Sequence, residues 1–141
     1  DGIRDTSVTG VQTCALPILK VLLMKTTLEN FVPKGWGYEK WIVNNEDYCG
    51  KILFFVKGLK CSWHYHKVKK ETFYVQSGSI KLFYSFEDSL DDADVIVLHK
   101  GDKFEVPVGL RHQMIALEDT ELFEFSTQHM EEDSYRIVKG D

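Results

Sequence analysis

The sequence has 141 residues, of which 43% are hydrophobic and 28% are charged. That length suits one domain with one packed core, and the composition is typical of an ordinary globular chain rather than a disordered or fibrous one. The formal net charge of −5 argues against a nucleic acid or an anionic membrane as a partner held by bulk electrostatics. No run of 18 apolar residues occurs, so the sequence predicts no membrane span.

The first residues of the chain carry no hydrophobic period of 2 or 3.6. Residues 8–18 resemble a translated sequencing adapter, and residues 1–5 resemble the primer that precedes such an adapter. We therefore expect residues 1–23 to be a non-native leader and residues 24–141 to form a single domain that starts at Met24. The cysteines of that domain, Cys49 and Cys61, form no disulfide framework and suit a reducing, cytoplasmic location.

From Met24 onward, short segments rich in Val, Ile, Phe, Tyr and Trp alternate with glycine and acidic turns. In chain order, strands are predicted over residues 40–44, 50–56, 61–66, 72–76, 79–85, 94–99, 103–106, 111–117 and 121–126. No segment has a long helical stripe of apolar residues. Many short strands in one small domain predict an all-β fold, built as an antiparallel sandwich or barrel.

Two stretches of the sequence carry side chains suited to a metal ion. His64 and His66 alternate on a predicted strand and therefore point to the same face, where two imidazoles can take adjacent positions on one metal. Glu71 lies on the next strand, past a turn over residues 67–70. His112 follows a second turn over residues 107–109. Three histidines and one glutamate predict a site for one divalent transition metal.

These two stretches resemble the two motifs of the cupin superfamily. Nine motif positions are matched in order, namely Gly58, His64, His66, Glu71 and Gly78 in the first motif and Gly101, Pro107, Gly109 and His112 in the second. Ala116 stands where the family has Asn, a residue that is not a ligand. The resemblance implies a double-stranded β-helix, which is a small jelly-roll barrel with the metal inside. The short span between the motifs implies a single-domain cupin.

The flanking segments resemble the cupin domain of type II mannose-6-phosphate isomerase. Residues 35–41 are similar to the segment that opens that domain, and residues 122–136 are similar to its closing segment, in which an acidic pair precedes an arginine. The sequence departs from that family at Gly35, where the family has Pro, and in the wider spacing between the histidines and Glu71. The resemblance implies a small-molecule substrate, a sugar phosphate or a nucleotide sugar. A homodimer is a further expectation, because many small cupins dimerise.

Three functions remain open at this point. A metal-dependent isomerase of the mannose-6-phosphate isomerase type is favoured, and it predicts zinc or another redox-inert ion. A cupin oxygenase is an alternative, and it predicts iron or manganese; nickel also suits the same ligands. A non-catalytic sugar-binding or regulatory cupin is the third, so the sequence alone does not decide whether the chain is an enzyme.

Aldose–ketose isomerisation needs a base that moves a proton, and the sequence does not identify one. Strand parity makes Glu124 and Lys60 candidates. A sugar phosphate also needs cations, for which the candidates near the ligands are Lys67, Lys69, Lys70 and Arg111. Alternatively, the three lysines serve only to make a surface turn soluble. Arg111 neighbours His112 on a predicted strand, so its side chain could instead point to the opposite face. His99 and His129 are expected to be structural or exposed.

Overall fold

The computed structural model describes residues 30–140, and the leader expected over residues 1–23 lies outside the described residues. The described chain consists of strands and one short 3-10 helix, η1 (Glu131–Asp133). The strands are β1 (Asn30–Lys34), β2 (Gly37–Asn44), β3 (Cys49–Phe55), β4 (Trp63–Tyr65), β5 (Glu71–Ser77), β6 (Ser79–Ser85), β7 (Asp94–His99), β8 (Lys103–Val106), β9 (Arg111–Ala116), β10 (Thr120–Ser126) and β11 (Tyr135–Val138).

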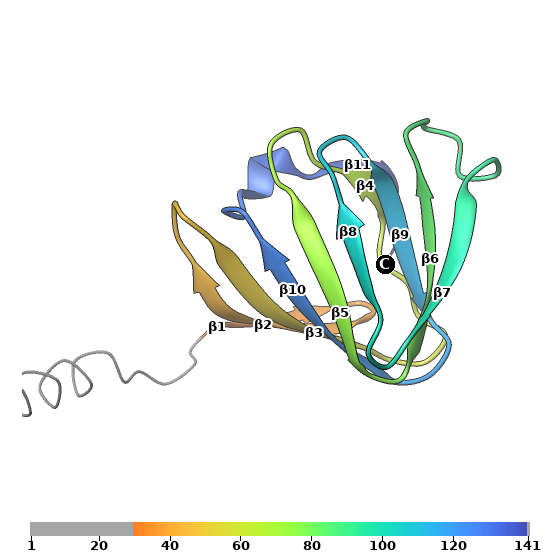
Figure 1. Ribbon diagram of the computed structural model, residues 1–141, viewed down its shortest axis with the longest axis horizontal. Coiled ribbons are helices and arrows are strands. Elements are labelled where there is room, and N and C mark those ends of the chain that lie inside the picture. The colour runs from red at the N-terminus through yellow and green to blue at the C-terminus, as the bar shows by residue number, and fades with distance from the viewer. Residues whose placement is uncertain (1–29, 141) are drawn as a thin grey trace, which may run out of the picture.

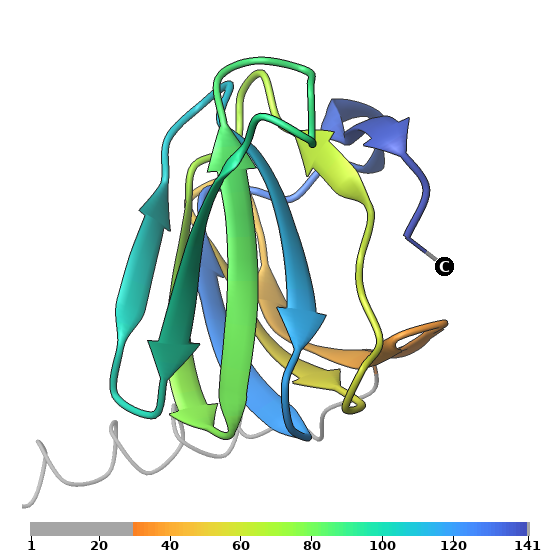
Figure 2. The same ribbon diagram turned by 90° about the vertical axis from the view of Figure 1, so that its right-hand side faces the viewer.

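The strands form two antiparallel sheets. The six-stranded sheet has the order β1-β2-β3-β10-β5-β8, and the five-stranded sheet has the order β11-β4-β9-β6-β7. Figures 1 and 2 show the two sheets facing each other. The all-β jelly-roll architecture expected from the sequence is thereby confirmed.

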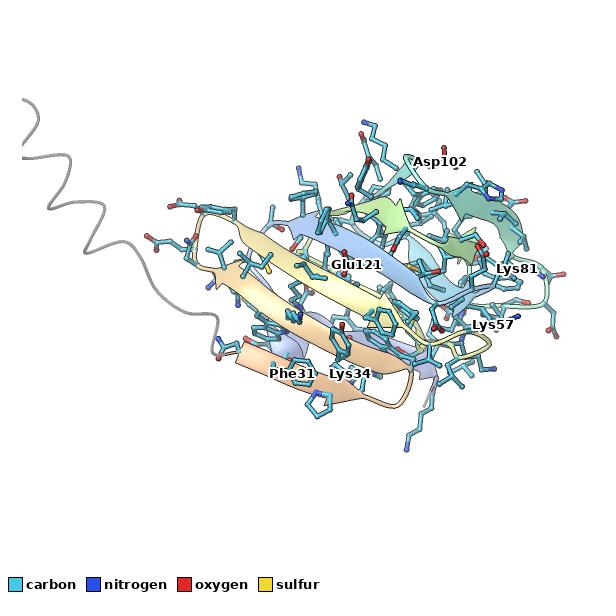
Figure 3. The ribbon with its side chains drawn as sticks, turned by 90° about the horizontal axis from the view of Figure 1, so that it is seen from below. Phe31, Lys34, Lys57, Lys81, Asp102 and Glu121 are labelled. Carbon is cyan, nitrogen blue, oxygen red and sulfur yellow. The ribbon has the colours of Figure 1, made fainter. Side chains whose placement is uncertain are left out.

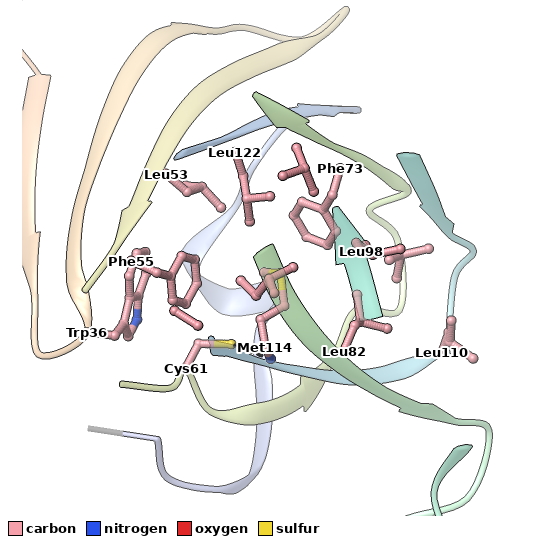
Figure 4. Packing of buried hydrophobic residues seen from close by; sticks show 14 residues of the cluster. Trp36, Leu53, Phe55, Cys61, Phe73, Leu82, Leu98, Leu110, Met114 and Leu122 are labelled. Atoms are coloured by element: carbon pink, nitrogen blue, oxygen red, sulfur yellow. Dashed lines mark hydrogen bonds between the residues drawn. The ribbon is translucent and has the colours of Figure 1, made fainter. Parts of the chain in front are cut away.

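The hydrophobic core lies between the sheets and follows from the alternation of side chains along each strand. In β3, every second residue is buried, and β5 begins with the same alternation. Leu53, Phe73 and Leu122 from the six-stranded sheet meet Leu82 and Met114 from the five-stranded sheet (Figure 4). Burial of each such side chain contributes ~1.5–3 kcal/mol to folding.

Most charged side chains of the described residues lie on the outside, and the buried exceptions are Lys51, Lys69, Glu71, Glu124 and Asp133. Figure 3 shows Lys57 and Asp102 at the periphery of the molecule, and both are exposed. In residues 30–140, no helix has the length and hydropathy that a bilayer-spanning segment requires.

The predicted strands differ from the observed ones mainly at the two ends of the domain. Two observed strands were not predicted: β1, which contains Pro33 and pairs on one side only, and β11, all of whose residues are exposed. Neither strand has a buried alternating face, so neither has the apolar period that marks a strand in the sequence. The predicted strand over residues 61–66 shortens to β4, because the chain pairs with β9 only at His64.

Candidate metal centre

The candidate ligands come from both sheets and meet inside the barrel. His64 in β4 and His112 in β9 are register partners across neighbouring strands. His66 follows β4 directly, and Glu71 is the first residue of β5 in the opposite sheet. His66, Glu71 and His112 are buried, so the four side chains converge in the interior.

The distances between these side chains are those of a cluster that could hold one ion. One ring nitrogen from each of His64, His66 and His112 lies within 4.8 Å of the others. Oε2 of Glu71 lies 3.2 Å from Nε2 of His112 and 3.5 Å from Nε2 of His66. The structure thus brings together the four residues that the sequence analysis singled out as ligands.

The backbone orients all three imidazoles in the same way. Each Nδ1 lies within hydrogen-bond distance of a main-chain carbonyl, which can only accept, so Nδ1 carries the proton and a neutral ring keeps its lone pair on Nε2. The hydrogen bonds run from His64 to Ser62 (3.0 Å), from His66 to Asp133 (2.8 Å) and from His112 to Leu110 (3.1 Å). Burial holds the pKa of His64 well below its ordinary value, and the neighbouring His112 lowers it further. Bonds of this kind fix the tautomer of metal-binding histidines.

The resulting arrangement fits a cation. Nε2 of His66 and Oε2 of Glu71 are both buried and find no hydrogen-bond partner in residues 30–140. They face each other at 3.5 Å, where a lone pair and a carboxylate oxygen repel unless a positive charge lies between them. Three imidazole nitrogens and one carboxylate oxygen are a donor set for a divalent transition metal.

Lys69 determines how Glu71 faces this site. Its Nζ contacts Oε1 of Glu71 at 2.5 Å and Oε1 of Glu124 at 3.0 Å, and all three side chains are buried. Burial alone would lower the pKa of Lys69, but Glu124 and Glu71 outweigh it and hold that pKa above its ordinary value. Burial likewise opposes ionisation of Glu71, yet Lys69 and the two histidines hold its pKa well below the ordinary range. Glu71 is therefore a carboxylate that offers one oxygen, Oε2, to the histidines.

A cavity of ≈ 360 Å³ opens beside the cluster. Its wall includes a second group of charged side chains from β2 and β3. Lys51, which is buried, lies 3.6 Å from Glu39, and Glu39 also accepts a hydrogen bond of 2.6 Å from Nε1 of Trp41. His129 completes this part of the wall. Nδ1 of His129 lies 3.4 Å from Nζ of Lys69.

The candidate base and cation residues separate into two groups. Glu124 and Lys69 line the cavity, and Lys60 lies instead along a separate hollow next to Ile115. Lys67 and Lys70 are exposed and do not line the cavity.

Arg111 also lies outside the cavity wall. Its guanidinium contacts Asp88 at 2.7 Å, and it lies over the ring of Tyr65 at 3.9 Å. Because Arg111 and His112 are consecutive in β9, their side chains point to opposite faces of the sheet. Of the four cation candidates, only Lys69 is therefore in the wall.

Several residues of the site were not predicted. Asp133, Arg136 and Lys139 follow η1 or belong to it, and the last two line the cavity. A partial signal exists for Arg136, because it ends a segment, an acidic pair followed by an arginine, that resembles the closing segment of the isomerase cupin domain. No signal in the sequence indicated that Asp133 would reach His66, which is 67 residues away.

Several solved structures have a similar fold. KdgF from Halomonas sp. superimposes with a TM-score of 0.63 and 18% identity, over 74% of this chain and 92% of that one. The capsular polysaccharide assembling protein CapF from Staphylococcus aureus gives 0.67 and 17%, over 76% of this chain and 33% of that one. A single-residue variant of oxalate decarboxylase from Bacillus subtilis gives 0.66 and 21%, over 76% and 30%. This chain thus spans about a third of the latter two proteins.

No protein with a curated description matches the sequence at a significant level. The family comparison gives a positive result. Residues 52–125, which are more than half of the chain, match the family described as "Cupin domain". These residues include both histidine-bearing stretches and the strands β4, β5 and β9 that position the candidate ligands. The chain belongs to the cupin domain family.

Proposed function

We propose that this cupin is a metal-dependent isomerase of the mannose-6-phosphate isomerase type, acting on a sugar phosphate or a nucleotide sugar, with zinc as its ion. The observation that carries the proposal is a buried carboxylate, Glu124, in the wall of the cavity that also holds His64, His66, Glu71 and His112. A polar cavity of ≈ 360 Å³ is of the size that encloses a small molecule. CapF, one of the structures with the same fold, is described as a capsular polysaccharide assembling protein.

The ion would be held by the three histidines and Oε2 of Glu71. When bound, it supplies Lewis acidity that polarises a carbonyl and the neighbouring hydroxyl of a sugar. The remaining tasks belong to side chains of the cavity. Glu124 would take the proton from the carbon next to the carbonyl and return it to the former carbonyl carbon, as a general base and then a general acid, while the hydroxyl proton passes to the former carbonyl oxygen. Lys69 lies 3.0 Å from Glu124 and holds this carboxylate in place.

The first test is metal content per chain. We expect the full chain to contain near-stoichiometric zinc, which the double variant His64→Ala/His112→Ala loses. The control is His99→Ala, because His99 is exposed and its side chain is not part of the cluster. Iron or manganese together with oxygen consumption would replace the isomerase with a cupin oxygenase. A chain that binds no metal even after reloading would overturn both enzymes and leave a sugar-binding module.

The second test is turnover of mannose 6-phosphate by the zinc-loaded chain. Chelation should abolish turnover, and added zinc should restore it. Glu124→Gln should keep the zinc but lose a factor of about 10²–10⁴ in kcat, which is the usual contribution of a positioned acid–base group. Full zinc content without turnover of any sugar phosphate or nucleotide sugar would contradict the isomerase proposal.

A further inference from the structure

Arg136 is placed next to a candidate metal ligand by the pairing of two strands. In the register of β11 and β4, Arg136 lies directly opposite His64, and Tyr135 lies opposite Tyr65. Directly opposed residues of an antiparallel pair share one face of the sheet, with their Cβ atoms ~4.5–5.5 Å apart. The rings of Tyr65 and Tyr135 stack on one face at 5.2 Å, so Arg136 shares the other face with His64 and lines the cavity. Figure 2 shows β11 beside β4 at the edge of this sheet.

The segment after β11 brings a second cation to the same wall. Gly140 packs so tightly against the main chain of Cys61 and Ser62 that a Cβ there would lie 2.0 Å from the carbonyl carbon of Cys61. Only glycine allows this approach. The close contact keeps the preceding residue, Lys139, at the cavity, which it lines together with Arg136 and Ser62.

The charges in the wall leave these two cations without a partner. Each carboxylate that lines the cavity contacts a lysine or a histidine. The pairs are Glu39 with Lys34 and Lys51, Glu71 and Glu124 with Lys69, and Glu131 with His129. Within residues 30–140, Arg136 and Lys139 make no ion pair. No carboxylate of the described residues balances their two positive charges, although the candidate metal site lies beside them.

We propose that Arg136, with Lys139 beside it, forms an oxyanion subsite that binds the phosphate or carboxylate group of the ligand entering the metal cavity. A guanidinium presents paired N–H donors that match two oxygens of such a group, and Lys139 adds a point charge. The inference rests on the proposed function for the identity of the cavity's ligand, but it does not require turnover. It assigns the anion of a sugar phosphate to Arg136 and Lys139, in β11 and directly after it. The earlier candidates Lys67, Lys70 and Arg111 have no part in this subsite.

The test measures binding to the zinc-loaded full chain by calorimetry. The probes are fructose 6-phosphate, gluconate, inorganic phosphate and uncharged fructose. We expect fructose 6-phosphate or gluconate to bind more tightly than fructose, and the stronger of the two identifies the anion as phosphate or carboxylate. Arg136→Gln should weaken that binding about tenfold to a hundredfold, which is the loss expected for hydrogen bonds to a charged group. Arg136→Lys should recover part of the loss, and Lys139→Gln should cause a smaller one.

Two controls make the result specific. Lys103→Gln removes the same charge at an exposed position, where Lys103 contacts Glu105, and should leave the affinities unchanged. Zinc content and thermal unfolding should be the same in all variants, because Arg136 is exposed and lies on an edge strand. Unchanged affinity in Arg136→Gln would overturn the subsite, as would wild-type chain that binds fructose as tightly as the charged probes. A chain that binds the anions through Arg136 but turns nothing over would refute the isomerase alone.

Discussion

The carbonyl oxygen of Asp133 accepts a hydrogen bond from Nδ1 of His66 at 2.8 Å, while the carboxylate of the same residue caps the turn that follows His66. That carboxylate accepts from the main-chain N–H groups of Lys67, Val68 and Lys69 at distances of 2.8–3.2 Å. Burial opposes its ionisation, but these three bonds outweigh burial and lower the pKa of Asp133. One residue of η1 thus orients a ligand and shapes the loop between two ligands.

Replacement of Asp133 by Ala should therefore affect both stability and metal binding. Loss of hydrogen bonds to a charged group should lower the free energy of unfolding by ~1.5–3 kcal/mol, measured by urea unfolding of the zinc-free chain. Zinc affinity should also fall, by up to about 10-fold, because the main-chain carbonyl that accepts from His66 remains but the carboxylate no longer ties it to the turn. Asp102→Ala, which removes one hydrogen bond to the exposed N–H of His99, is the matched control and should have a smaller effect. Equal stability of Asp133→Ala and the wild type would refute this role.

Lys69 is the shared counter-ion of two buried carboxylates, so its removal should be costly. Lys69→Met leaves Glu71 without its lysine and Glu124 with only Lys51, at 4.0 Å, and should lower the free energy of unfolding by ~3–5 kcal/mol. Chemical unfolding of the zinc-free chain measures this loss. Lys70→Met, at an exposed neighbouring position, should change stability little. The added substitution Glu124→Gln should recover part of the loss, and its failure to do so would show that charge repulsion is not the cause.

His129 should make the fold less stable at mildly acidic pH. Burial lowers its pKa, Lys51 lowers it further, and the hydrogen bond to Glu131 opposes them only in part. Below the ordinary histidine pKa of about 6.5, the unfolded chain takes up a proton that folded His129 does not. The free energy of unfolding should therefore fall as the pH drops below 6.5 towards the folded-state pKa.

The measurement compares urea unfolding of wild type and His129→Gln at pH 7 and pH 5.5. The variant should lose less stability over this interval, because one lowered histidine pKa is gone. NMR titration of the His129 imidazole should give a pKa below 6.5. A pKa above that value would reverse the sign of the expected difference.

Two motif glycines should respond differently to replacement by alanine. Gly78 has φ of +83°, and a Cβ on it would lie 2.4 Å from the carbonyl oxygen of Asp119. Gly101 has φ of +94°, but a Cβ there would meet nothing within 4 Å. Gly101→Ala should cost about 1–2 kcal/mol for the left-handed backbone alone. Gly78→Ala should cost a further ~1–3 kcal/mol for overpacking, so equal midpoints in thermal unfolding would contradict this difference.

The sequence by itself was enough to predict the parts of this protein that depend on local periodicity. Alternation along a strand indicated that His64 and His66 share a face, and it indicated where most of the strands that build the two sheets would lie. It also raised the possibility that Arg111 points away from His112, as it does. These relationships hold within a few residues, because the pleat of a strand repeats every two positions.

Only the tertiary structure decided which distant residues complete the site. Lys69 looks like one of three solvated lysines in a turn, yet it is buried because Glu71 and Glu124 arrive from β5 and β10. Arg136 comes to lie opposite His64 only because β11, which has no apolar period, pairs with β4. Such contacts arise from strand pairing and charge pairing between segments far apart in the chain. The residues themselves leave no local pattern from which that pairing can be predicted.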